Sequence, residues 1–132
     1  MTLPLTCVLV AWVLIWIPRG FVIRAQGRLP GGFDNKHPRD QQTKLEGWGK
    51  RAHAAHQNTF EAFAPFAAAV FVTQLAHANA KWSAVLAVTF VASRTLYPLL
   101  YIANVDRARS LVWLVGAVAT GALFALPLLA PS

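Results

Sequence analysis

Charged residues are scarce in this sequence. Only 13% of its 132 residues are Asp, Glu, Lys or Arg, whereas a soluble domain carries roughly 25%. Acidic residues are the scarcest, five against twelve Lys and Arg, and 56% of the residues are hydrophobic. The length suits one domain. Such sparse charge excludes an ordinary soluble protein and is typical of a chain that crosses a membrane several times.

Cysteine is nearly absent as well. Cys7 is the only one, so the chain forms no internal disulfide and holds no cysteine metal cluster. His53 and His56 come closest to a metal site, but no third ligand stands at a zinc-site spacing, and we expect a hydrated pair at the membrane interface. The sequence also contains no nucleophilic triad, no phosphate-binding loop and no strand pattern. We therefore predict an all-α protein without a metal site.

The formal net charge of +7 raises the question of a nucleic-acid partner. Seven of the twelve Lys and Arg lie between Arg24 and Arg51, in and beside a polar connection between apolar segments. Basic residues next to membrane spans mark cytoplasmic loops, because positive charge is retained on that side. This distribution explains the charge without nucleic acid. It predicts that the first loop is cytoplasmic and that both termini lie on the exported side.

Apolar segments at four places are long enough to cross a bilayer as helices. Short connections after the second and third segments predict antiparallel neighbours, and the fourth has a face of small residues suited to close packing. The expected fold is an antiparallel four-helix transmembrane bundle that forms one domain over residues 1–132. Pro18 is expected to kink or end the first regular helix, and Pro38 to break helices in the first loop. The predicted spans are about residues 3–23, 48–76, 82–103 and 110–129.

The second span begins with the only polar cluster that continues into an apolar run. At 3.6 residues per turn, Arg51, Asn58 and Glu61 fall on one stripe of a helix, and Pro65 extends this stripe. Glu61 lies roughly 15 Å beyond Lys50, at about 1.5 Å per residue. A carboxylate at that depth is costly and normally faces a partner or a water-filled cavity.

The third span offers such a partner. Arg94, Tyr97 and Tyr101 share one helix face, at offsets of three and seven. Arg94 and Glu61 each lie about ten residues from the cytoplasmic end of their own helix, so opposite charges sit at similar depth on neighbouring helices. On charge alone two interpretations stay open. The two side chains form a structural ion pair, or they line a polar pocket together with Asn58 and Tyr97.

Arginines at the cytoplasmic ends of the spans favour the pocket. Arg51, Arg107 and Arg109 lie there, and guanidinium groups bind carboxylates through paired hydrogen bonds. Lipid headgroups are the alternative ligands. They account well for these end positions but poorly for Arg94, which lies within its span. The pattern therefore indicates an anionic ligand held by arginines and tyrosine hydroxyls.

Several short motifs combine into one family pattern. They are Arg51–Ala52–His53, Asn58, Glu61, Pro65–Phe66, Arg94–Thr95–Leu96–Tyr97 and Tyr101. Together with four spans and a long basic first loop, they resemble the MAPEG family, the membrane-associated proteins of eicosanoid and glutathione metabolism. The resemblance implies a homotrimer of four-helix subunits, with glutathione bound as a cosubstrate between neighbouring subunits in the cytoplasmic half. It also implies a thiol-activating arginine near the fourth span, for which Arg107 and Arg109 are candidates.

This resemblance leads to a functional expectation. The protein binds glutathione, or a similar anionic thiol, and transfers it to lipophilic electrophiles from the bilayer, with or without peroxidase activity. Arg94 and Tyr97 are the expected catalytic residues, because a guanidinium and a hydroxyl near the sulfur lower the pKa of the thiol. The alternative is a non-catalytic membrane protein with a purely structural Glu61–Arg94 pair. The residues expected to bind glutathione are Arg51, Asn58, Glu61, Tyr101, Arg107 and Arg109.

Overall fold

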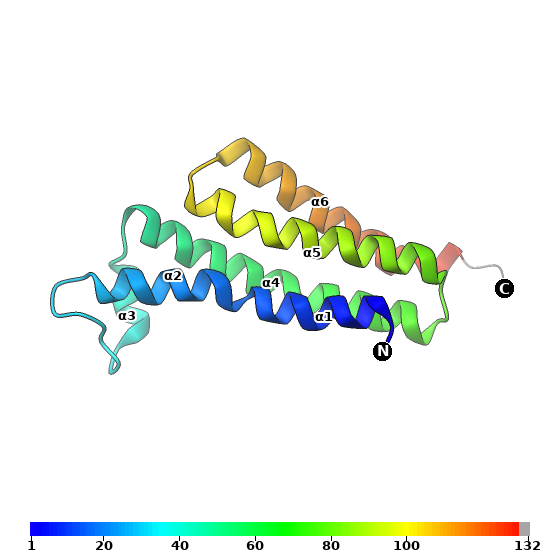
Figure 1. The fold of residues 1–132 in the computed structure, drawn as a ribbon, viewed down its shortest axis with the longest axis horizontal. Coiled ribbons are helices and arrows are strands. Elements are labelled where there is room, and N and C mark those ends of the chain that lie inside the picture. The colour runs from blue at the N-terminus through cyan, green and yellow to red at the C-terminus, as the bar shows by residue number, and fades with distance from the viewer. Residues whose placement is uncertain (130–132) are drawn as a thin grey trace.

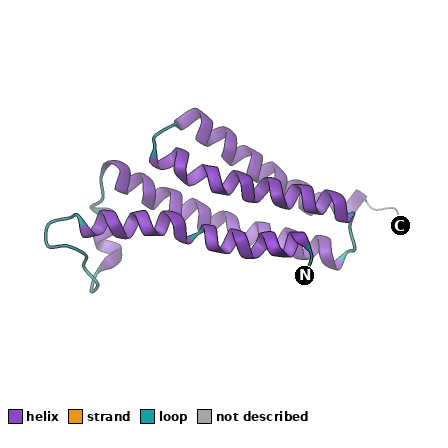
Figure 2. Cartoon of the chain, in the orientation of Figure 1, coloured by secondary structure: helices purple, strands orange, loops and turns teal. Residues whose placement is uncertain are grey.

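The computed structural model describes residues 1–129, and this part of the chain is helical and contains no β-strand (Figures 1 and 2). Each predicted span corresponds to a helical segment whose ends differ from the prediction by a few residues. The last three residues of the predicted domain 1–132 lie outside the described part. The elements are α1 (Leu3–Leu14), α2 (Trp16–Gly27), α3 (Pro38–Thr43), α4 (Gly47–Leu75), α5 (Ala80–Ile102), α6 (Asp106–Ala125) and the 3-10 helix η1 (Leu126–Leu129).

The first predicted span is interrupted between α1 and α2. The interruption falls at Ile15, three residues before Pro18. Proline has no N–H, and its ring crowds the carbonyl of the residue four positions earlier, here Leu14. Pro18 thus lies close to a one-residue break in the regular helix, which resumes at once and continues to Gly27, beyond the predicted end of the span.

Successive long helices run in opposite directions (Figure 1). The loop from α2 to α4 and the turn from α5 to α6 lie at one end of the molecule, and both ends of the described chain lie at the other, beside the α4–α5 turn. Helices α5 and α6 pack closely, α4 packs against α2, α5 and α6, and α1 packs against α4 and α5. The first loop, predicted to be cytoplasmic, and the turn from α5 to α6 therefore lie at the same end.

Aromatic and small residues form the centre of the helix packing. The rings of Phe66 and Phe90 stack with centroids 3.8 Å apart, and both side chains are buried. Ala69, Ala87 and Ala119 are also buried around them, so the helix backbones approach closely. Many large apolar side chains on the outer faces remain exposed, as expected for a surface that faces lipid or another subunit.

Three helical segments are long and apolar enough to cross a membrane. They are Leu3–Gly27, Ala80–Ile102 and Asp106–Leu129. Helix α4 is longer than any single helix among them, at 29 residues, but its first half carries the polar cluster described above. The polar side chains of α4 therefore enter a molecule that is otherwise built from apolar helices.

The first loop is more ordered than its prolines and glycines suggest. Pro38 was expected to break helices, but it occupies the first turn of α3, where a missing N–H costs no hydrogen bond. Two buried glutamines fasten the loop: Gln26 Nε2 donates to Pro38 O (2.9 Å) and to Gln41 Oε1 (3.2 Å). Gln41 Nε2 donates in turn to Gly32 O at 2.6 Å. The loop is thus folded back onto the end of α2.

Asp34 makes a second, smaller group of hydrogen bonds in the same loop. Its carboxylate accepts the backbone N–H groups of Lys36 (2.8 Å) and His37 (3.1 Å). These hydrogen bonds, with Lys36 the larger cause, hold the pKa of Asp34 below its usual range. Because the folded pKa is depressed, this turn is favoured above the ordinary carboxyl pKa and loses that support as the pH falls through the lowered value.

Replacement of Gln41 by alanine is predicted to loosen the first loop. The variant loses the contacts to Gly32 and Gln26 and leaves buried groups without partners, at a local cost of about 1–3 kcal/mol. Trypsin should then cleave the loop about tenfold faster, since local opening limits cleavage. Gln42→Ala is the matched control, because the Gln42 side chain makes no hydrogen bond within residues 1–129. Equal cleavage rates in both variants would show that Gln41 does not hold the loop.

Candidate functional site

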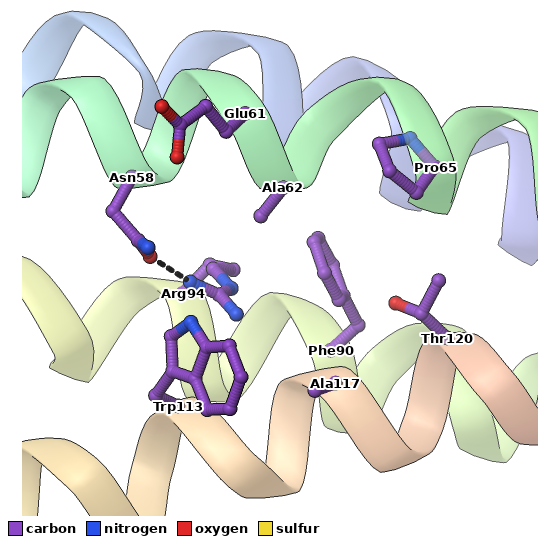
Figure 3. Close-up of a pocket in the computed structure, with 9 residues that line it drawn as sticks. All are labelled: Asn58, Glu61, Ala62, Pro65, Phe90, Arg94, Trp113, Ala117 and Thr120. Carbon is purple, nitrogen blue, oxygen red and sulfur yellow. Dashed lines mark hydrogen bonds between the residues drawn. The ribbon is translucent and has the colours of Figure 1, made fainter.

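A cavity of about 320 Å³ lies where α4, α5 and α6 meet (Figure 3). Its polar end is formed by Asn58, Glu61 and Arg94, and its other walls are mainly apolar. The side chains of α4 face those of α5 and α6 across it (Figure 3). The full lining consists of Asn58, Glu61, Ala62, Pro65, Phe90, Arg94, Trp113, Ala117 and Thr120.

Arg94 is a buried cation at the polar end of this cavity, with only 3% of its surface exposed. Its Nη1 donates to Asn58 Oδ1 at 3.0 Å (Figure 3). Its Cζ lies 5.4 Å from the ring centre of Phe90 and 5.2 Å from that of Tyr97, within the range of cation–π attraction. Its Nε is buried without a hydrogen-bond partner in residues 1–129. The guanidinium is therefore held by an amide and two aromatic rings, and part of its donor capacity is unused.

The predicted ion pair between Glu61 and Arg94 is wrong for the single chain. Over residues 1–129, the one ion pair present joins His37 and Asp34 in the first loop, with a histidine that is charged only when protonated. Glu61 lines the same cavity as Arg94, which confirms the predicted match in depth, but its side chain is exposed. Three residues advance a helix by about 300°, so Glu61 lies about 60° around α4 from Asn58, and the amide meets the guanidinium instead.

A second, smaller cavity of about 240 Å³ collects the tyrosines of α5. Tyr97 and Tyr101 meet edge to face with centroids 5.7 Å apart, and Arg109 Cζ lies 4.3 Å over the Tyr101 ring. Ser110 and Trp113 complete the lining. Trp113 also lines the first cavity, so one indole borders both.

The two candidate arginines before the fourth span are separated by this geometry. Arg109 joins the tyrosines, whereas Arg107 is exposed and lines neither cavity. Arg51 is also placed apart from both, because its Nε donates to Ile102 O at 3.0 Å. Arg51 thus caps the end of α5 and ties it to α4.

The histidine pair lies on another side of α4. His53 and His56 are partly buried in a cavity of about 530 Å³ that also includes Arg19 and Arg39. His56 Nδ1 lies 3.1 Å from Ile15 O, at the interruption between α1 and α2. His56 is therefore involved in helix packing, and both histidines lie apart from the cavity around Arg94.

Some lining residues were not expected as site residues from the sequence. Phe90, Trp113, Ala117 and Thr120 carry no charge and resemble lipid-facing or packing residues in a sequence. Part of this lining could have been predicted from the small residues on one face of α6, which include Ala117 and Thr120. Small side chains let α6 come near α5 and leave room beside them for a cavity.

A known protein family matches this chain. The model of the MAPEG family matches residues 3–129, nearly the whole chain. The chain belongs to the MAPEG family. No curated protein and no solved structure matches it. Together with its apolar helices, the family makes this MAPEG member an integral membrane protein.

Asn58 is predicted to be the main partner of Arg94. Asn58→Ala removes the acceptor of Nη1 and should lower the stability by about 1.5–3 kcal/mol, the usual range for a hydrogen bond to a charged group. Glu61→Gln should cost less than Asn58→Ala, because the Glu61 side chain makes no ion pair within residues 1–129. Thermal unfolding in detergent measures both changes.

Gln57→Ala is the matched control for this prediction, since Gln57 is exposed and adjacent in sequence. It should leave the melting temperature near that of the parent. A larger loss for Glu61→Gln than for Asn58→Ala would contradict the assignment and restore Glu61 as the partner of Arg94.

Proposed function

We propose that this MAPEG protein binds glutathione and transfers it to lipophilic electrophiles. The observation that carries the proposal is the buried guanidinium of Arg94 at the polar end of a cavity whose remaining walls are largely apolar. The family points to glutathione metabolism in general. A cavity with one cationic end and one apolar end suits a reaction between an anionic thiol and an apolar molecule.

The charges around the two cavities complement those of glutathione, which has two carboxylates, an ammonium group and a thiol. Arg94 and Arg109 offer guanidinium donors for the anionic groups. The exposed carboxylate of Glu61 suits the ammonium group, and Asn58 adds an amide beside it. The hydroxyls of Tyr97 and Tyr101 supply further hydrogen bonds. Arg51 and Arg107 are proposed to act at the outer edge of the site.

The proposed chemistry is stabilisation of the thiolate. A cation near the sulfur lowers the pKa of the thiol, so that more of it is ionised at neutral pH. Arg94 supplies this charge, and the Tyr97 hydroxyl donates a hydrogen bond to the anion. The thiolate then attacks the electrophilic carbon and forms the C–S bond. A leaving group departs with its electron pair or, when a double bond is attacked, the product carbanion takes a proton from water.

We further propose that the functional unit is a homotrimer of four-helix transmembrane subunits, with α4 as the fourth span. Glu61 and Pro65 line the cavity but are exposed in a single chain, and many outer side chains are apolar. A neighbouring subunit would cover these groups and complete the site. Lipophilic electrophiles would enter laterally from the bilayer.

The alternative is a non-catalytic membrane protein. The sequence supported this alternative through a Glu61–Arg94 ion pair in which the two charges would balance each other. Within the single chain Arg94 contacts Asn58 and makes no ion pair with Glu61, so this support is lost. Binding of a lipid headgroup by the basic residues remains a second outcome of the tests below.

The proposed topology places the first loop in the cytoplasm and both termini on the exported side. Lys36 lies in the first loop and Lys81 near the start of α5, and both are exposed. The first loop and the start of α5 lie at opposite ends of the molecule (Figure 1). In a background without Cys7, an impermeant thiol reagent added to intact cells should label Lys81→Cys but not Lys36→Cys. Labelling of Lys36→Cys alone would invert the topology.

The proposed function predicts that glutathione raises the melting temperature of the purified protein and that a generic aromatic electrophile is conjugated. Tyr97→Phe removes one hydroxyl and should cost roughly 0.5–1.5 kcal/mol at most. The variant should therefore fold like the parent, while its thiolate absorbance and conjugation rate fall.

Trp82→Phe is the control, because Trp82 lies in the first turn of α5, whereas Arg94 and Tyr97 lie in its second half. It should leave glutathione binding intact. Full activity of Tyr97→Phe would remove Tyr97 from the catalytic residues. Absence of any glutathione effect on the parent protein would refute the proposed function, and stabilisation by anionic lipid alone would support headgroup binding instead.

A further inference from the structure

Gly116 on α6 lies directly against the buried side chain of Arg94. A β-carbon at this position would come within 2.5 Å of Ser93 Oγ, 3.0 Å of Arg94 Nη2 and 3.2 Å of Arg94 Nε. Distances below 3.0 Å essentially never occur for real β-carbons. Gly121 on the same helix has no such neighbour within 4 Å. Helix α6 therefore depends on glycine at position 116, and not at 121, for its approach to Arg94.

The neighbours of Gly116 have little freedom to move away. Ser93 is buried, and its Oγ donates to Phe90 O at 2.8 Å, so rotation of the hydroxyl would lose that hydrogen bond. Arg94 is held between the rings of Phe90 and Tyr97 and bonded to Asn58. A methyl group at position 116 would push the guanidinium away from α6 and alter its contact with Asn58.

We propose that Gly116 is a positioning residue for Arg94. By presenting bare backbone, it sets the guanidinium where Nη1 reaches Asn58 and where its charge faces the cavity that takes the thiol. The statement about the thiol rests on the proposed function. The orientation of a cation on α5 is thus determined by the backbone of α6, in place of a carboxylate partner.

Four variants test this role: Gly116→Ala, Ser93→Ala, the double variant Gly116→Ala/Ser93→Ala, and Gly121→Ala. Ser93→Ala removes the closest atom, Oγ, and leaves the two nitrogens of Arg94 at 3.0 and 3.2 Å as the nearest neighbours of the new methyl group. The double variant therefore separates the clash with Ser93, which affects folding, from the clash with Arg94, which affects the site.

Gly116→Ala should lower the melting temperature. The double variant should melt between Gly116→Ala and Ser93→Ala, because the clash with Ser93 is gone while the contact of Arg94 with Asn58 is still weakened. The double variant should also bind glutathione about tenfold more weakly than Ser93→Ala, the effect of one weakened hydrogen bond to a charged group. Its bound thiol should ionise at a higher pH, because the cation is displaced from the sulfur. Gly121→Ala should bind glutathione like the parent and keep or raise the melting temperature, since alanine favours the helix.

A further measurement needs no glutathione. Asn58→Ala should lower the melting temperature in the Ser93→Ala background, and by less than half as much in the double variant, because Arg94 has already been moved off Asn58. Equal losses in the two backgrounds would overturn the proposal. Where Ser93→Ala binds glutathione, full binding and an unchanged pH profile in the double variant would overturn it as well. If the parent binds no glutathione, the proposed function fails, and the measurement on Asn58 alone decides the role of Gly116.

Discussion

The centre of this molecule depends on one buried guanidinium, that of Arg94, which has no carboxylate partner within residues 1–129. Removal of an ion from water costs several kcal/mol even after relaxation of the protein. Three helices share in offsetting this cost: α4 provides Asn58, α5 provides the rings beside Arg94, and α6 provides the space at Gly116. None of these contacts neutralises the charge. The cation is held in place and keeps its attraction for an anion.

The sequence predicted the helices and the depth of the polar residues, and both follow from local rules. Apolar length predicts a spanning helix, and the rise per residue converts position in the chain into depth. Glu61 and Arg94 line the same cavity for this reason. Their rotation about each helix axis depends on packing between helices, which spacing does not encode. That is why Asn58, and not Glu61, meets the guanidinium.

Other differences between prediction and structure also depend on where a residue lies in the folded chain. Pro38 is read as a helix breaker from composition alone, but its effect depends on its place in the helix, and the first turn tolerates it. Arg107 and Arg109 are equivalent by charge and separated only by which side of α6 each occupies. The contact of Gly116 could not be predicted, because a glycine reports what surrounds it only once the neighbouring helix is in place.

One indole forms part of the wall of both cavities. Trp113 borders the cavity around Arg94 on one side and the cavity of the tyrosines on the other. A molecule that shifts this ring on binding changes the free volume available to a second molecule. Thermodynamic linkage makes such an effect reciprocal, so two molecules bound in these cavities would alter each other's affinity by the same factor. A single side chain thereby provides a physical route for cooperative or antagonistic binding without movement of the helices.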